Sequence, residues 1–306
     1  MGVYAVAFIM FTLDFAKRSA GALEREASAL SAGNGTRQLG GTAGGVSTIA
    51  PVIPSKPGSL RFERIALALT VVGWVLHVIG VLLRGFAQGH VPWSNMFEFS
   101  LTSSAIIVGV FLGVQLWQNL RFLGAYITGF ALIVLGVGTV NFYVDVKPLP
   151  PALQSFWLVI HVFVAVLGTS FFAIGAGLSV TQLLQARAAA GRAVGLRFLQ
   201  TLPSAEVLEN MAYRVIVVGF MFWTFTLIAG AIWAERAWGR YWGWDTKEVW
   251  TFIIWVIYAG YIHARATRGW RGSRSAWLAI VGFAAVMFNF GIVNVFFKGL
   301  HAYSGL

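Results

Sequence analysis

The feature that most constrains this chain is a succession of long, uninterrupted apolar segments separated by short polar turns. An apolar segment of about 20 residues is long enough to cross a bilayer as a helix. A closed β-barrel would instead show strands of about ten residues with alternating apolar and polar side chains. We therefore expect an all-α integral membrane protein, built as a polytopic helical bundle. The predicted spans are 64–84, 98–117, 122–141, 155–183, 213–234, 249–264 and 276–297.

The N-terminal region differs from the rest in composition. Residues 1–18 begin with a short apolar run that we predict to be a first transmembrane helix, which brings the expected total to about eight. Residues 19–60 are rich in Gly, Ser, Ala and Thr and are predicted to form a flexible cytoplasmic linker. Residues 61–306 are predicted to form the main membrane domain. Lys17 and Arg18 follow the first apolar run and no basic residue precedes it. This charge order is the reverse of a secretion signal, so we expect no cleavable signal peptide.

The distribution of basic residues predicts the orientation of the chain. Only 11% of the residues are charged and the net charge is +11, whereas soluble domains carry about 25% charged residues. Sixteen Lys and Arg fall on one set of predicted loops and six on the other. Cytoplasmic loops are the basic ones in membrane proteins, so we expect both termini on the outer side of the cell (plasma) membrane. The excess positive charge then indicates contact with membrane lipid rather than with nucleic acid.

A tryptophan-rich segment falls in the predicted outer loop 233–250, which holds five of the 13 tryptophans. Interfacial aromatic belts are the alternative explanation, but a belt needs only one or two Trp at each helix end. The segment therefore predicts a surface for a large, flat, apolar ligand, on which aromatic faces stack. Asp245 and Glu248 have the spacing of a capping box at the start of the next span. For Asp245, a helix cap and a ligand contact are equally good predictions.

The histidines are the candidate metal ligands, because the chain has no cysteine. His77 and His263 fall inside predicted spans, where ionisable side chains are costly and tend to be functional. Hydrogen bonds between helices are the alternative role for them. His161 and His301 fall near the outer ends of two other spans, level with the tryptophan-rich loop. Two neutral imidazoles from different helices can be the axial ligands of a heme, and two unrelated interfacial histidines are the alternative.

Other functions for such a chain make different demands on the histidines. Electron carriers of the diheme cytochrome b type place two histidines on one helix and two on a neighbour. Here each histidine is on a different segment, which disfavours that function without excluding it. A transporter of another flat molecule, such as a quinone, and an assembly scaffold that binds only protein are further alternatives. For His90, two residues before Pro92, we expect a role in loop structure.

The segment WGRYWGWDTKEVW at 238–250 closely resembles the WWD signature of heme-handling proteins in cytochrome c maturation. Within that superfamily, residues 61–306 are most similar to the CcsA/ResC type, called CcsB in some bacteria. The other segments that carry the similarity are the helix of His77, GHVPWSNMFEF at 89–99, the span that begins near His161, and NFGIVNVFFKGLHAY at 289–303. The chain departs from the family at Phe97-Glu98, where Tyr-Glu is more common. The shorter CcmC-type relatives lack the inner histidine pair.

The resemblance implies a function in the assembly of cytochrome c. The family exports heme b and presents it for covalent attachment to the CxxCH cysteines of apocytochrome c. The resemblance also implies a ResB-like membrane partner, and hence a subunit of a holocytochrome c synthase (heme lyase) that has no catalytic residue of its own. A membrane electron carrier with two-histidine structural hemes is the main alternative.

The resemblance further implies which residues bind heme. His77 and His263 would hold the iron within the membrane, after heme has entered between the spans 64–84 and 249–264. His161 and His301 would hold the iron at the outer face. The other residues implied for the outer site are Trp238, Trp242, Trp244 and Asp245. The three tryptophans would carry the porphyrin plane.

Overall fold

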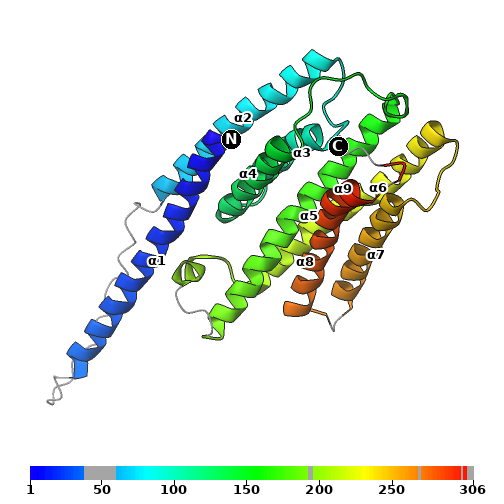
Figure 1. Ribbon diagram of the computed structural model, residues 1–306. Coiled ribbons are helices and arrows are strands. Elements are labelled where there is room, and N and C mark those ends of the chain that lie inside the picture. The colour runs from blue at the N-terminus through cyan, green and yellow to red at the C-terminus, as the bar shows by residue number, and fades with distance from the viewer. Residues whose placement is uncertain (38–59, 192–195, 268–269, 298, 302–306) are drawn as a thin grey trace.

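The structure, a computed structural model, describes residues 1–37, 60–191, 196–267, 270–297 and 299–301. Within these ranges the regular structure is entirely helical, with no strand (Figure 1). The long helices are α1 (Gly2–Arg37), α2 (Leu60–Gln88), α3 (Met96–Val114), α4 (Gly124–Asn141), α5 (Phe156–Ala189), α6 (Ala205–Trp238), α7 (Thr246–Ala266) and α8 (Ser273–Phe288). The short elements are η1 (Arg121–Leu123), η2 (Pro151–Leu153), η3 (Arg197–Thr201), the π-helical turn η4 (Asn289–Val293) and α9 (Asn294–Phe296).

The helices confirm the prediction of a polytopic helical membrane protein. Among the described residues, six helical segments are long and apolar enough to cross a membrane. These are Arg61–Gln88, Met96–Val114, Arg121–Asn141, Phe156–Ala189, Ala205–Trp238 and Ser273–Phe296. α1 and α7 correspond to the two other predicted spans but are not among the six. The total of eight spans and the outer location of both termini stay predictions.

The first helix is longer than the sequence predicts. α1 continues to Arg37, so residues 19–37, expected to belong to a flexible linker, are helical. The reason is local composition, because the stretch ALEREASAL at 22–30 consists largely of good helix formers. The prediction of a linker depends instead on the Gly, Ser and Thr of the whole segment 19–60. The rest of the predicted linker, 38–59, lies outside the described residues.

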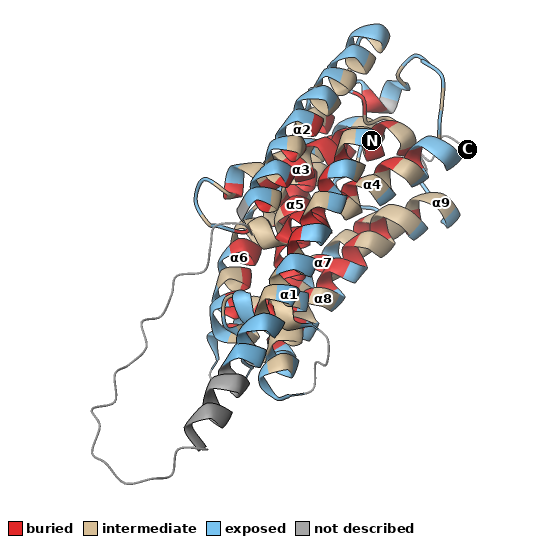
Figure 2. Cartoon of the chain, turned by 90° about the vertical axis from the view of Figure 1, so that its left-hand side faces the viewer, coloured by how far each residue is buried: buried red, intermediate tan, exposed pale blue. Residues whose placement is uncertain are grey.

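The bundle is organised around α5. This helix packs closely against α6 and also contacts α3 and α8. α1 and α2 pack together on one flank, while α7 packs against α6 and α8 on the opposite flank (Figure 1). In the centre, the rings of Phe172 on α5 and Tyr258 on α7 stack with centroids 3.6 Å apart. Figure 2 shows buried residues on the helix faces that point into the bundle and exposed residues on the outer faces.

The outer faces of the spans carry apolar side chains. On α2, Leu82, Leu83 and Phe86 are 53%, 64% and 81% exposed. In water such a surface would be an interaction site or an aggregation liability. In a bilayer it costs nothing, because lipid chains are as apolar as leucine. The exposure of α2 therefore agrees with its assignment as a membrane span.

Several charged side chains at one end of the bundle form ion pairs between neighbouring helices. Arg18 on α1 forms ion pairs with Asp14 of its own helix and with Glu63 on α2. At the same end of the bundle Arg265 on α7 lies 3.2 Å from Glu209 on α6. A partly buried charge is tolerated when a partner and further hydrogen bonds compensate it. These pairs therefore fix neighbouring helices to one another without leaving a bare charge inside.

Candidate functional site

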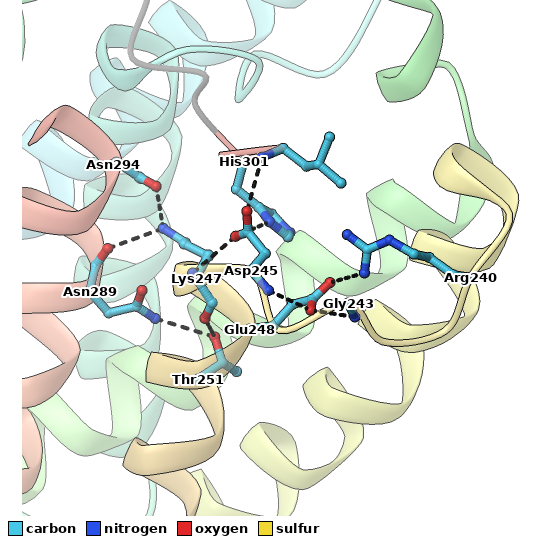
Figure 3. A network of polar contacts seen from close by, with 10 residues as sticks. Arg240, Gly243, Asp245, Lys247, Glu248, Thr251, Asn289, Asn294 and His301 are labelled. Atoms are coloured by element: carbon cyan, nitrogen blue, oxygen red, sulfur yellow. Dashed lines mark hydrogen bonds and ion pairs between the residues drawn. The ribbon is translucent and has the colours of Figure 1, made fainter. Parts of the chain in front are cut away.

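The tryptophan-rich loop is held at both of its ends. α6 ends at Trp238 and is capped by Gly239, whose φ of 71° is the left-handed conformation that glycine adopts most readily. α7 begins with Asp245 as its N-cap in a capping box with Glu248, as the sequence predicts. The Glu248 carboxylate accepts hydrogen bonds from the backbone N–H groups of Gly243 (2.8 Å) and Asp245 (3.1 Å). The loop from Gly239 to Asp245 is thereby held between α6 and α7 (Figure 3).

Asp245 also ties this loop to the C-terminal segment. Its carboxylate accepts hydrogen bonds from the backbone N–H of Lys247 (3.0 Å), from the backbone N–H of Leu300 (2.9 Å) and from Nδ1 of His301 (2.9 Å). Gly299 is needed for this contact, since a Cβ at that position would lie 2.3 Å from Oδ2 of Asp245. Asp245 therefore caps α7, as one of its two predicted roles requires, and it also orients a candidate iron ligand, while a direct contact with the heme stays a prediction (Figure 3).

These contacts change the acidity of Asp245. Burial raises the pKa of the carboxyl, but the hydrogen bonds from His301, Lys247 and Leu300 outweigh burial and lower the pKa to about 2. A carboxyl with a lowered pKa stabilises the folded state above its unfolded pKa of about 3.9. That stabilisation is lost as the pH falls through the folded value.

Replacing Asp245 by Asn is therefore expected to lower stability in a pH-dependent way. Asn is as good an N-cap as Asp, so the change mainly removes the charge-assisted bond to His301. Such a bond contributes about 1.5–3 kcal/mol. Thermal unfolding in detergent should show a constant deficit of Asp245→Asn above about pH 5, which shrinks toward zero as the pH falls to about 2. A stability deficit that does not change over this pH range would contradict the lowered pKa of Asp245.

His161 is oriented by α6. Its Nδ1 donates a hydrogen bond to the main-chain carbonyl of Thr226 (3.0 Å), because a carbonyl can only accept. The imidazole lies nearly parallel to the ring of Trp233, with centroids 5.9 Å apart. It fits against Gly230, where a Cβ would lie 2.7 Å from Cε1 of His161. The proton on Nδ1 leaves Nε2 as the nitrogen with a lone pair for a metal.

His301 is oriented in the same way by Asp245. The carboxylate accepts from Nδ1, so Nε2 is again left for a metal. The ring of His301 makes edge contacts with Trp233 and Trp238, at centroid distances of 5.5 and 4.8 Å. A metal-binding histidine almost always donates its other N–H to a carboxylate or a backbone carbonyl. His161 donates to a backbone carbonyl and His301 donates to a carboxylate.

The two outer histidines share the same cavities. One cavity of about 80 Å³ lies beside Trp242 and Thr226, and a second of about 110 Å³ lies beside Trp93 and Leu153. His161, His301, Ala165, Lys247 and Phe290 line both. Sites for ligands of drug size usually measure about 300 Å³ or more. Each of the two cavities is therefore smaller than a site for a whole porphyrin.

The tryptophans of the signature occupy three different positions. Trp242 lines the first cavity. Trp238 packs behind His301 and Trp233. Trp244 lies outside both cavities, is 77% exposed and has a φ of 60°, which is unusual for a bulky side chain. Its ring meets that of Trp242 edge-on at 5.8 Å, so these two form an exposed aromatic corner.

The predicted inner histidine pair is not brought together. His77 on α2 lies 3.3 Å from the hydroxyl of Tyr4 and lines a separate cavity of about 440 Å³. His263 is exposed near the far end of α7. α2 and α7 lie on opposite flanks of the bundle, with α5 between them (Figure 1). The structure therefore does not place His77 and His263 at one site, and the prediction that both hold one iron, after heme has entered between these two helices, stays a prediction.

Three polar residues that lie at the outer site are not among the predicted heme-binding residues. Lys247 on the first turn of α7 donates hydrogen bonds to the main-chain carbonyl of Asn289 (3.2 Å) and to the side chain of Asn294. The π-helical turn η4 brings these two oxygens to one ammonium group (Figure 3). Single π-helical turns inside α-helices are frequent at functional sites. The only available signal was that both asparagines lie in the segment 289–303 that carries the family resemblance.

The fold and the site define a polytopic helical membrane protein with two oriented imidazoles and a tryptophan-rich loop at one end of its bundle. The profile of a family described as Cytochrome C assembly protein matches residues 64–301. The chain belongs to that family, and within it to the CcsA type of cytochrome c biogenesis protein. Its membership supports a role in cytochrome c maturation.

Three curated relatives illustrate the similarity, and each is named cytochrome c biogenesis protein CcsA. The relative from Guillardia theta is 35% identical over 258 residues, which cover 78% of this chain and 84% of the relative. The one from Porphyra purpurea is 32% identical over 291 residues, covering 81% and 91%. The one from Synechococcus sp. (strain CC9902) is 33% identical over 278 residues, covering 81% and 88%.

Proposed function

We propose that this protein holds heme b at the extracytoplasmic end of its bundle and presents it for covalent attachment to apocytochrome c. The observation that carries the proposal is the matched orientation of His161 and His301, each with Nδ1 engaged and Nε2 left for iron, at the same two cavities. Coordination by two histidines fills both axial positions and so keeps oxygen off the iron.

The rest of the site supports binding of a flat ligand. Trp242 offers an aromatic wall at the first cavity and Phe290 borders both cavities. The exposed corner of Trp242 and Trp244 is placed to meet a ligand or a protein that approaches the loop. When heme is bound, its vinyl groups supply the bond-forming carbons, and this chain supplies position and ligation. We assign no catalytic acid, base or nucleophile to the chain itself.

The proposal extends to location and partners. The basic residues of the loops favour a cell membrane protein with this end of the bundle outside. We propose that heme reaches the site by export from the cytoplasmic side and that a ResB-like membrane protein works with the chain as the second part of a heme lyase. The apocytochrome would supply its own histidine and its two CxxCH thiols.

The test is the absorption spectrum of the protein purified in mild detergent, alone and with its partner. We expect reduced protein to show the spectrum of low-spin iron with two histidine ligands. His161→Ala and His301→Ala should each weaken it, and added imidazole should restore it. His90→Ala serves as the control, because His90 hydrogen-bonds Gln88 and Val91 in an outer loop and lines neither cavity of the outer site.

Two results would contradict the proposal. A heme spectrum that ignores both substitutions would place the iron elsewhere and favour an electron carrier with structural hemes. No heme spectrum at all, with the partner present and heme supplied, would favour a scaffold that binds only protein. In either case cytochrome c maturation in cells should be measured for the same variants.

A further inference from the structure

Lys247 is the one lysine that lines the outer site in the part of the chain that the structure describes. It borders both cavities together with His161 and His301. Its ammonium group donates to the carbonyl of Asn289 and to the side-chain oxygen of Asn294, and it lies 4.9 Å from the ring centre of Phe290. All three of these partners are uncharged. Figure 3 shows the ammonium group bonded to Asn289 and to Asn294.

The carboxylates nearby are already used by other groups. Asp245 accepts from His301 and from the backbone of Lys247 and Leu300. Glu248 accepts from two backbone N–H groups and lies 3.6 Å from Arg240. Among the described residues, no carboxylate lies within ion-pair distance of the Lys247 ammonium. A partly buried cation with only neutral partners retains a strong attraction for an anion that can enter its cavity.

The heme of the proposed function brings such an anion. Its porphyrin carries two propionate carboxylates, which remain ionised at neutral pH and need donors when the ring leaves water. Lys247 also lies on the first turn of α7, where the helix dipole favours negative charge. Arg240 is a poorer candidate, because it is paired with Glu248 and lies over the ring of Trp238 at 6.0 Å.

We infer that Lys247 binds a propionate of the heme held at the outer site, so that this site selects iron porphyrins with a free carboxylate. The inference rests on the proposed function and adds a specificity determinant to it. Asn289 and Asn294 act as positioning residues, because they aim the ammonium into the cavities. The π-helical turn is what places both of them within reach of it.

The test compares iron protoporphyrin IX with its dimethyl ester, which keeps the ring and the iron but carries no negative charge. Both are titrated into the purified protein and followed by the two-histidine spectrum. A hydrogen bond to a charged group is typically worth a factor of about 10 to 100 in affinity. We expect the unchanged protein to prefer the free acid by about tenfold or more, and Lys247→Met to bind both forms equally. Lys247→Arg should keep much of the preference.

The control is Arg236→Gln, which removes an exposed cation of the same outer region that lines neither cavity. It should leave the preference unchanged. A preference that survives in Lys247→Met, or equal binding of acid and ester by the unchanged protein with the two-histidine spectrum intact, would overturn the role of Lys247 alone. Failure of the unchanged protein to show that spectrum with either form would overturn the proposed function as well.

Discussion

Replacing Gly230 by alanine is expected to weaken heme binding at the outer site by about 100-fold, the upper end of the effect of losing a partner that orients a metal ligand. A Cβ at this position would lie 2.7 Å from Cε1 and 2.9 Å from Nδ1 of His161. Nδ1 is the atom that donates to the carbonyl of Thr226. The added methyl must therefore push the imidazole aside and break the bond that orients it.

The measurement is a heme titration followed by absorbance, with thermal unfolding recorded in parallel. Gly260→Ala is the matched control, because it is also a glycine-to-alanine change inside a helix, yet nothing lies within 4 Å of the added Cβ. A second test places Gly230→Ala in a His161→Ala background. If Gly230 acts through His161, it should add no further loss of affinity there. Equal losses in both backgrounds would contradict this role.

The sequence was sufficient to predict six spans that the structure supports, because a helix that crosses a bilayer needs a long apolar segment. Long apolar runs mark where a helix crosses, whichever way each side chain points. The outer pair could be predicted for the same reason. His161 lies near the start of α5 and His301 follows α9, so we could expect both at one end of the bundle. At that end the helix termini converge on a single loop cluster, which brings the two rings to shared cavities.

For the inner histidines, depth in the membrane is not enough to predict a shared site. The apolar runs place His77 and His263 inside spans and the resemblance implies that they form a pair, but depth in the membrane does not determine which neighbour a helix faces. α5 occupies the centre and separates α2 from α7. The contacts of Lys247 with Asn289 and Asn294 were missed for a related reason. These contacts depend on one π-helical turn, and no residue pattern in the chain predicts that turn.

Removing Glu98 is expected to cost about 3–5 kcal/mol of stability, because it leaves Arg84 with an uncompensated charge inside the protein. The Glu98 side chain is 2% exposed and accepts from Arg84 at 2.9 Å. Its second oxygen accepts from the backbone N–H (3.1 Å) and the hydroxyl (2.7 Å) of Ser94. Ser94 and Trp93 line the second cavity. One carboxylate thus compensates a buried cation and also positions a wall of the proposed heme site.

These two roles predict different outcomes for single and double variants. Glu98→Leu should lower the unfolding temperature strongly, whereas Arg84→Met with Glu98→Leu should recover most of the loss, because replacing a buried ion pair by apolar side chains is often neutral. Heme affinity should stay reduced in the double variant, since Ser94 loses its acceptor in both. A double variant as unstable as the single one would show that the uncompensated charge of Arg84 is not the cause of the lost stability. Full recovery of heme affinity would show that the segment around Ser94 keeps its position without Glu98. Stability and ligand binding at this end of the bundle would then depend on different contacts.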